Sequence, residues 1–217
     1  MTKTGSSAAT GRWLYLSFYN WAVVVGWVQV LYCASSALLD SGHEVVYATV
    51  EWPLLLAQTA SVMEILHWIL GIIRYPVLET LPQITARLYL TWGILWSFPE
   101  TRSHILVTFL IISWSINQII GYSFFGTSEI FGLAPSWLLW LRYNTILILY
   151  PIGMISEVGL IFVATPFMEE SEKYCLRMPN KWNFSFDYYY ASTLLTVLYV
   201  MGFPYLFMHM VASRKGV

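Results

Sequence analysis

Three long stretches of this chain contain no charged residue, and they limit its fold more than any other feature. The stretches cover residues 13–39, 103–128 and 188–213. Each exceeds the ~20 residues that an α-helix needs to cross about 30 Å of hydrocarbon. Hydrophobic residues make up 58% of the chain and charged residues 11%, whereas a soluble domain carries about 25% charge. The sequence therefore predicts an integral membrane protein.

Charge and cysteine content exclude several other classes of protein. The net charge of −1 argues against a basic surface for nucleic acid, so no nucleic-acid partner is expected. The two cysteines, Cys33 and Cys175, are too few and too far apart for a disulfide framework or a zinc site.

The hydrophobic pattern predicts an all-α membrane protein, a single bundle of six transmembrane helices. We expect this domain to occupy residues 13–211, between a disordered tail over 1–12 and a short basic tail over 212–217. The predicted spans cover residues 13–38, 53–73, 83–98, 104–125, 136–165 and 186–211.

Charged side chains divide these spans into two groups. The first and sixth spans have no charge in their cores. The second carries Glu64, the third carries Arg87, and the fifth carries Arg142 and Glu157. Ionisable groups avoid lipid, so these three spans, together with an amide pair in the fourth, are expected to line the bundle interior. Alternatively, Glu64 and Arg142 lie at span ends and extend to the membrane interface.

The predicted orientation rests on the termini. An even number of spans places both termini on one side, and the dominance of the first span favours the cytosol. The tail Arg214-Lys215-Gly216-Val217 resembles a dilysine-type retrieval signal, which requires a cytosolic end. We therefore expect a multi-pass protein of the endoplasmic reticulum membrane.

The sequence contains no complete metal or nucleotide motif. The four histidines are not clustered, unlike the histidine boxes of membrane di-iron enzymes. Glu64 and His67 match half of a di-iron carboxylate motif, but such a site needs two copies, so a buried hydrogen-bonded pair is favoured. No glycine-rich dinucleotide motif or P-loop occurs. We expect neither a metal nor a cofactor.

Tyr150 and Glu157 are candidate catalytic residues inside the fifth predicted span. They lie seven residues apart, which is about two helical turns, so both side chains face the same way. A carboxyl group at bilayer depth costs roughly 2.5–3.5 kcal/mol and therefore indicates a function. An acid and a phenol facing one cavity predict proton transfer on a lipid-like substrate. Pro151 predicts a kink just before Tyr150, and Gly153 leaves room for an acyl chain beside the backbone.

The segment from Tyr150 to Glu157 resembles the Y-P-x-G-x-x-S-E signature of the 3-hydroxyacyl-CoA dehydratases. Plant members of this family are called PASTICCINO, and animal members were once called protein tyrosine phosphatase-like. The resemblance covers nearly the whole chain. Its other matching blocks are Tyr19-Asn20-Trp21, Gln58-Thr59-Ala60, Glu64-Ile65-Leu66-His67, Ser97-Phe98-Pro99-Glu100, Ala134-Pro135-Ser136-Trp137 and Asn183-Phe184-Ser185-Phe186-Asp187.

This resemblance implies an enzyme of very-long-chain fatty acid elongation that acts at the third step. Such an enzyme removes water from a (3R)-3-hydroxyacyl-CoA to give the trans-2-enoyl-CoA. Its partners would be membrane lipid and the other elongase subunits: the condensing enzyme, the ketoacyl reductase and the enoyl reductase. The family's catalytic tyrosine and glutamate fall on Tyr150 and Glu157, and its third-span arginine falls on Arg87. Supporting or substrate-binding candidates are Arg87, Arg142, Tyr143, Gly153 and Ser156.

One departure from the family pattern leaves an alternative open. Family members typically read W-S-x-x-E-x-I-R-Y in the fourth span, where this chain has Gln118 and Gly121 in place of the Glu and the Arg. These positions lie three apart on one helix face, so both members of an ion pair are missing together. The alternative function is a catalytically weak or inactive paralogue that acts as a scaffold for elongase subunits or other proteins.

For the enzyme, the working hypothesis assigns Glu157 as the base for the proton on Cα and Tyr150 as the donor to the departing hydroxyl. Seven residues correspond to about 10 Å along a regular helix, so the two side chains must lean together or the kink must shorten the gap. The acyl chain is expected to occupy a tunnel lined by Leu147, Met154 and Phe124.

Overall fold

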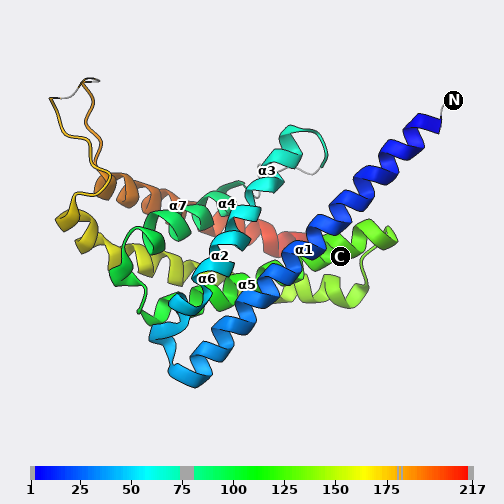
Figure 1. The fold of residues 1–217 in the computed structure, drawn as a ribbon, viewed down its shortest axis with the longest axis horizontal. Helices are drawn as coiled ribbons and strands as arrows, with labels where there is room; N and C mark the ends of the chain where they lie inside the picture. Colours follow the sequence, from blue (N-terminus) through cyan, green and yellow to red (C-terminus); the bar gives the residue numbers. More distant parts are fainter. Residues whose placement is uncertain (1–2, 74–80, 180, 182, 215–217) are drawn as a thin grey trace.

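The computed structural model describes residues 3–73, 81–179, 181 and 183–214, and this part of the chain is almost entirely helical (Figure 1). The long helices are α1 (Lys3–Ser41), α5 (Ile105–Phe131), α6 (Ser136–Ser171) and α7 (Tyr188–Arg214). The shorter elements are η1 (His43–Val45), α2 (Val46–Ala60), α3 (Val62–Ile69), α4 (Leu81–Leu88), the π-helix η3 (Tyr89–Trp96) and η4 (Pro99–Thr101). Within the described residues, β geometry is confined to one isolated bridge between Leu176 and Phe186.

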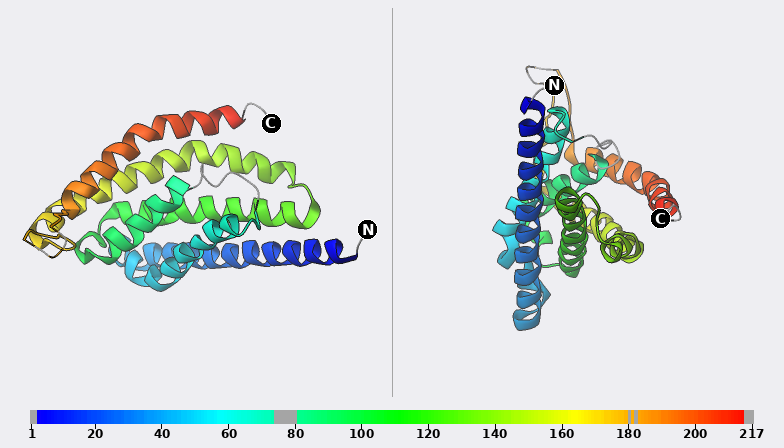
Figure 2. Two further views of the ribbon diagram at one scale, coloured as in Figure 1. Left: turned by 90° about the horizontal axis from the view of Figure 1, so that it is seen from above. Right: turned by 90° about the vertical axis from the view of Figure 1, so that its right-hand side faces the viewer.

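The four long helices pack side by side in the order α1, α5, α6, α7. α1 packs against α5, α5 against α6, and α6 against α7, while α2 packs against α1 and η3 contacts α6. Successive helical segments run in opposite directions, so both termini lie at the same end of the helices (Figure 2). This arrangement places α6 between α5 and α7, and α4 leads into η3, which contacts α6.

The all-helical prediction is confirmed, but six transmembrane helices are not. The second predicted span is divided at Ser61 between α2 and α3, and the third is divided between α4 and η3. Within the described residues, three helical stretches are long and apolar enough to cross a membrane, namely 11–41 of α1, the whole of α5 and the whole of α6. Because α2, α3, α4 and η3 are 15, 8, 8 and 8 residues long, each is shorter than the ~20 residues of a single spanning helix.

The first helix begins before the first predicted span, and the disordered tail expected over residues 1–12 stays a prediction. α1 begins at Lys3 and continues through residues 3–12 without a break. Extending an existing helix costs little compared with starting one, and this segment contains no proline to stop the extension. At the other end, α7 continues to Arg214, and residues 215–217 lie outside the described part.

Side chains from elsewhere satisfy the carbonyl groups of the π-helix η3. Arg102 Nε donates to the carbonyl oxygen of Leu95 at 2.7 Å, and Tyr188 Oη donates to that of Gly93 at 3.0 Å. Ser97 Oγ also donates to the carbonyl oxygen of Trp92 at 2.7 Å. The last carbonyls of any helix lack partners inside it, so such donors stabilise its end. The bond from Tyr188, the first residue of α7, also ties η3 to that helix.

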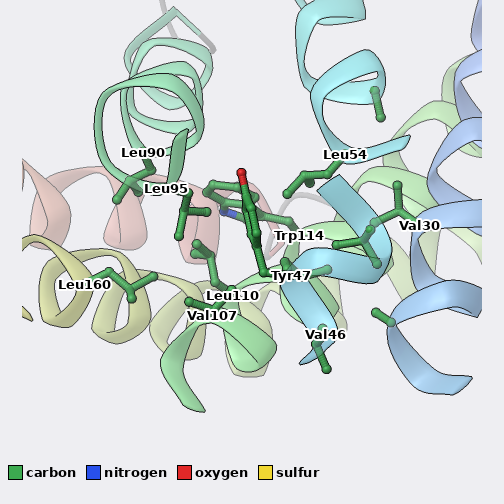
Figure 3. Packing of buried hydrophobic residues seen from close by; sticks show 14 of the residues in the cluster. Val30, Val46, Tyr47, Leu54, Leu90, Leu95, Val107, Leu110, Trp114 and Leu160 are labelled. Carbon is green, nitrogen blue, oxygen red and sulfur yellow. The ribbon is translucent and has the colours of Figure 1, made fainter. Parts of the chain in front are cut away.

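The core lies where α1, α2, η3, α5 and α6 meet. Figure 3 shows buried side chains of this cluster: Val30, Tyr47, Leu90, Leu95, Val107, Leu110, Trp114 and Leu160. Many other large apolar side chains are exposed, as along α7: Leu194, Leu195, Leu198, Met201, Tyr205 and Met208. A soluble monomer rarely exposes so continuous an apolar face, so these helices fit a protein surrounded by lipid.

Candidate active site

The Glu157 carboxylate is held by donors from two other helices. Glu157 lies on α6 and is only 6% exposed. Trp114 Nε1 of α5 donates to its Oε1 at 2.9 Å, and Tyr199 Oη of α7 donates to its Oε2. Burying a carboxylate is costly unless hydrogen bonds compensate for the lost water, and both oxygens receive one here. The sequence-based prediction that Glu157 faces the interior is therefore confirmed.

Tyr150 lies on the same helix, and its ring stacks on two phenylalanines of α7. Its ring is parallel to those of Phe203 and Phe207, with centroids 5.1 and 6.3 Å away and planes inclined by 9°. The hydroxyl oxygen is buried and has no hydrogen-bond partner among the described residues. Tyr150 also interacts electrostatically with Glu157 and Tyr199. Within the described residues, no acceptor therefore holds the proton of the Tyr150 phenol.

Arg87 brings a positive charge into the same region. It lies on α4, is 7% exposed, and interacts electrostatically with Glu157, Tyr199 and Tyr122. Its Nε and Nη1 atoms have no hydrogen-bond partner within the described ranges. A buried guanidinium near a buried carboxylate offsets part of the cost of burying each charge.

The other predicted site residues of α6 have separate roles. Ser156 is buried, and its hydroxyl donates to the carbonyl oxygen of Ile152 at 2.8 Å within the same helix. Gly153 is buried, and a Cβ there would lie 3.6 Å from Ser113 Oγ, so it packs against α5. The Arg142 guanidinium lies over the rings of Phe124 and Phe125, at 4.5 and 4.7 Å from their centroids. Tyr143 is half-buried next to Arg142.

The helix around these residues is continuous. α6 includes Pro151 and Pro166 without a break and bows along its length (Figure 2). Leu147 and Met154, predicted to line an acyl tunnel, are half-buried, and Phe124 is in contact with Arg142. The tunnel itself stays a prediction.

A second polar cluster lies between α1, α3 and α5. Tyr122 Oη donates to Glu64 Oε1, and Tyr15 Oη lies 2.8 Å from His67 Nε2. The prediction that Glu64 and His67 form a hydrogen bond with each other is therefore wrong, because each is hydrogen-bonded to a tyrosine of another helix instead. A small cavity with about 20 Å³ of space for water adjoins this cluster. The residues lining it are Leu16, Tyr19, Asn20, His67, Ile73, Phe125 and Glu129.

Sequence reasoning missed the contribution of the last helix. α7 has no charged residue in its core and was expected to stay outside the bundle interior, yet Tyr199 contacts Glu157 and Phe203 contacts Tyr150. One signal was available. Tyr199, Phe203 and Phe207 are spaced four apart and therefore share one helix face.

The two positions of α5 at which the sequence differs from the family pattern, Gln118 and Gly121, show no steric strain. Gln118 is half-buried, and a Cβ added at Gly121 would meet no atom within 4 Å outside its own helix turn. The position therefore has room for a side chain, and folding does not require glycine there.

We expect Gly121→Ala to raise stability, since glycine inside a helix costs about 0.5–1 kcal/mol relative to alanine. For a protein of this size, the thermal midpoint in detergent should rise by about 1–4 °C, with turnover unchanged. The matched control is Gly126→Ala on the same helix, where the new Cβ would lie 3.0 Å from Trp21 Nε1 and should give no gain. A lower midpoint for Gly121→Ala would contradict this account of the site.

Comparisons with known proteins place the chain among named relatives. The family model described as "Protein tyrosine phosphatase-like protein, PTPLA" matches residues 58–217. The very-long-chain (3R)-3-hydroxyacyl-CoA dehydratase PASTICCINO 2A of Oryza sativa subsp. japonica is 67% identical over 204 residues, which cover 94% of this chain and 92% of the relative. PASTICCINO 2 of Arabidopsis thaliana, with the same dehydratase name, is 58% identical over 204 residues, with coverages of 94% and 92%.

A more distant relative has the same activity in its name. The very-long-chain (3R)-3-hydroxyacyl-CoA dehydratase 2 of Homo sapiens is 35% identical over 204 residues, which cover 94% of this chain and 80% of the relative. No solved structure shows a significant match to the chain.

Proposed function

Because this chain belongs to the protein tyrosine phosphatase-like (PTPLA) family, we infer that it is a very-long-chain (3R)-3-hydroxyacyl-CoA dehydratase. It is a hydro-lyase that removes water from a 3-hydroxyacyl-CoA to give the trans-2-enoyl-CoA. The observation that carries this conclusion is 67% identity across 94% of the chain to a protein named for that activity. The scaffold alternative rested on Gln118 and Gly121, and the named relatives support the enzyme instead.

The chemistry is assigned to Glu157 and Tyr150. Glu157 acts as the base that removes the proton from Cα, and Tyr150 donates its proton to the hydroxyl leaving Cβ. The assignment is supported by the two hydroxyl environments, because Tyr150 Oη has no partner among the described residues whereas Tyr199 Oη already donates to Glu157. A general acid must be able to direct its proton to the substrate.

The step balances in atoms and charge. The electron pair of the Cα–H bond becomes the second bond between Cα and Cβ as the C–O bond breaks, and the hydroxyl leaves as water with the proton from Tyr150. The proton taken by Glu157 then returns to the Tyr150 phenolate and restores both groups. Arg87 supports this cycle because its positive charge, which interacts with Glu157 and Tyr199, stabilises negative charge at the site.

The membrane arrangement belongs to the same proposal. Six spans, with α2–α3 and α4–η3 each acting as one divided span, are supported by the alternating directions of the helices and by the two termini at one end (Figure 2). The tail of Arg214, Lys215, Gly216 and Val217 favours the endoplasmic reticulum with cytosolic termini. The other elongase subunits are the proposed partners, and membrane lipid surrounds the exposed apolar faces.

The direct test is a product assay. Protein purified in detergent is incubated with a long-chain (3R)-3-hydroxyacyl-CoA, and the trans-2-enoyl-CoA is separated and quantified. We expect product to form in proportion to enzyme and to time. If product does not exceed that of a boiled sample for any chain length tried, while the protein remains folded, the scaffold function takes precedence.

A further inference from the structure

The environment of Glu157 contains two phenols that differ in what they bind. Tyr199 Oη donates to Glu157 Oε2, and Trp114 Nε1 donates to Oε1. Building on the proposed function, we propose that Tyr199 is a positioning residue for the dehydration. Together with Trp114, it fixes the plane of the Glu157 carboxylate so that this base meets the proton on Cα.

A glutamate side chain can rotate its carboxylate group over a wide range. Its last torsion joins an sp³ carbon to the flat carboxylate and has a broad, shallow energy profile. A base must approach its proton within hydrogen-bond distance, and a misplacement of about 1 Å can cost 10²-fold in rate. One hydrogen bond to one oxygen leaves the carboxylate free to rotate about that contact. Two bonds, one to each oxygen, fix the plane.

The two donors are well suited to that task. Trp114 is 4% exposed and packs in the core between α2, η3 and α6 (Figure 3), and its indole nitrogen can only donate. Tyr199 lies on α7, the other long helix that packs against α6. Trp114 lies on α5, so the carboxylate is held between helices on either side of α6.

The same geometry separates the roles of Tyr199 and Tyr150. Both phenols interact electrostatically with Glu157, but of the two only Tyr199 is hydrogen-bonded to it. A phenol that donates to the base cannot at the same moment donate to the departing hydroxyl. Tyr199 therefore acts through Glu157, and Tyr150 acts on the substrate.

The test compares Tyr199→Phe with Tyr205→Phe, the same change on the same helix at a side chain that is 74% exposed. We expect kcat of Tyr199→Phe to fall about 10–100-fold, with KM within about twofold of the unchanged protein. The primary isotope effect with substrate deuterated at Cα should increase, because removal of that proton becomes slower. Tyr205→Phe should match the unchanged protein in all three quantities.

The isotope effect distinguishes positioning from structural damage. A misfolded fraction lowers the apparent kcat but leaves both KM and the isotope effect of the active molecules unchanged. An unchanged isotope effect, or a kcat within about twofold of the original, therefore overturns the positioning role. Trp114→Phe provides a second variant that removes the other donor, and it should shift the isotope effect in the same direction.

Failure of this inference is distinguishable from failure of the proposed function. If the unchanged protein forms no enoyl-CoA, the dehydratase assignment itself fails. If the unchanged protein is active, and Glu157→Gln is inactive while Tyr199→Phe behaves like Tyr205→Phe, only the positioning role fails.

Discussion

Replacing Glu157 by glutamine is expected to lower kcat by about 10²–10⁴-fold, because general base catalysis contributes about that factor. Glutamine keeps the size and shape of the side chain but cannot accept the proton from Cα. Substrate binding should change little, since the carboxylate acts on the reacting carbon and not on the CoA group. The measurement is the rate of enoyl-CoA formation at saturating substrate, together with KM.

The variant should remain folded, which makes the loss of rate interpretable. The glutamine carbonyl oxygen can still accept a hydrogen bond from Trp114 or Tyr199, and the other donor is left without a partner. An unsatisfied buried donor costs about 1–3 kcal/mol, so we expect a modestly lower thermal midpoint with an intact helical spectrum. If Glu157→Gln turns over within tenfold of the unchanged protein, the base lies elsewhere.

The helical fold could be predicted because it depends on the hydrophobicity of long stretches of sequence. Uncharged stretches of more than ~20 residues have few alternatives to a helix in lipid, and α1, α5 and α7 fall on those stretches. The division of the second pass at Ser61 and the π-helix η3 were not predictable in this way. They depend on local contacts, such as Arg102 donating to the carbonyl oxygen of Leu95, which a hydropathy sum does not contain.

The candidate site was only half visible in the sequence. Glu157 and Arg87 stood out because a charge at membrane depth needs a reason, and Tyr150 was found through its spacing from Glu157. Neutral aromatic residues carry no such signal. Tyr199 and Trp114 resemble the many tyrosines and tryptophans of a membrane interface, and only the packing of α5 and α7 against α6 identifies them as donors to Glu157.

Tyr150→Phe is expected to abolish most turnover while making the protein more stable. The hydroxyl is buried and has no partner among the described residues, and such a group costs about 1–3 kcal/mol until a substrate satisfies it. Removing it leaves the ring stacked on Phe203 and Phe207. We expect the thermal midpoint without substrate to rise by about 2–12 °C, and kcat to fall by about 10²–10⁴-fold because the general acid is lost.

Tyr199→Phe is the matched control for stability, since the chemical change is identical but that hydroxyl donates to Glu157. It should lower the midpoint, because removing one partner of a buried hydrogen bond leaves Oε2 unsatisfied. The same substitution would then change the thermal midpoint in opposite directions at two residues of one site. That result would identify the Tyr150 hydroxyl as a group kept for substrate at the expense of stability. A destabilised Tyr150→Phe that still forms enoyl-CoA at the original rate would instead assign that hydroxyl a structural role and remove it from the reaction.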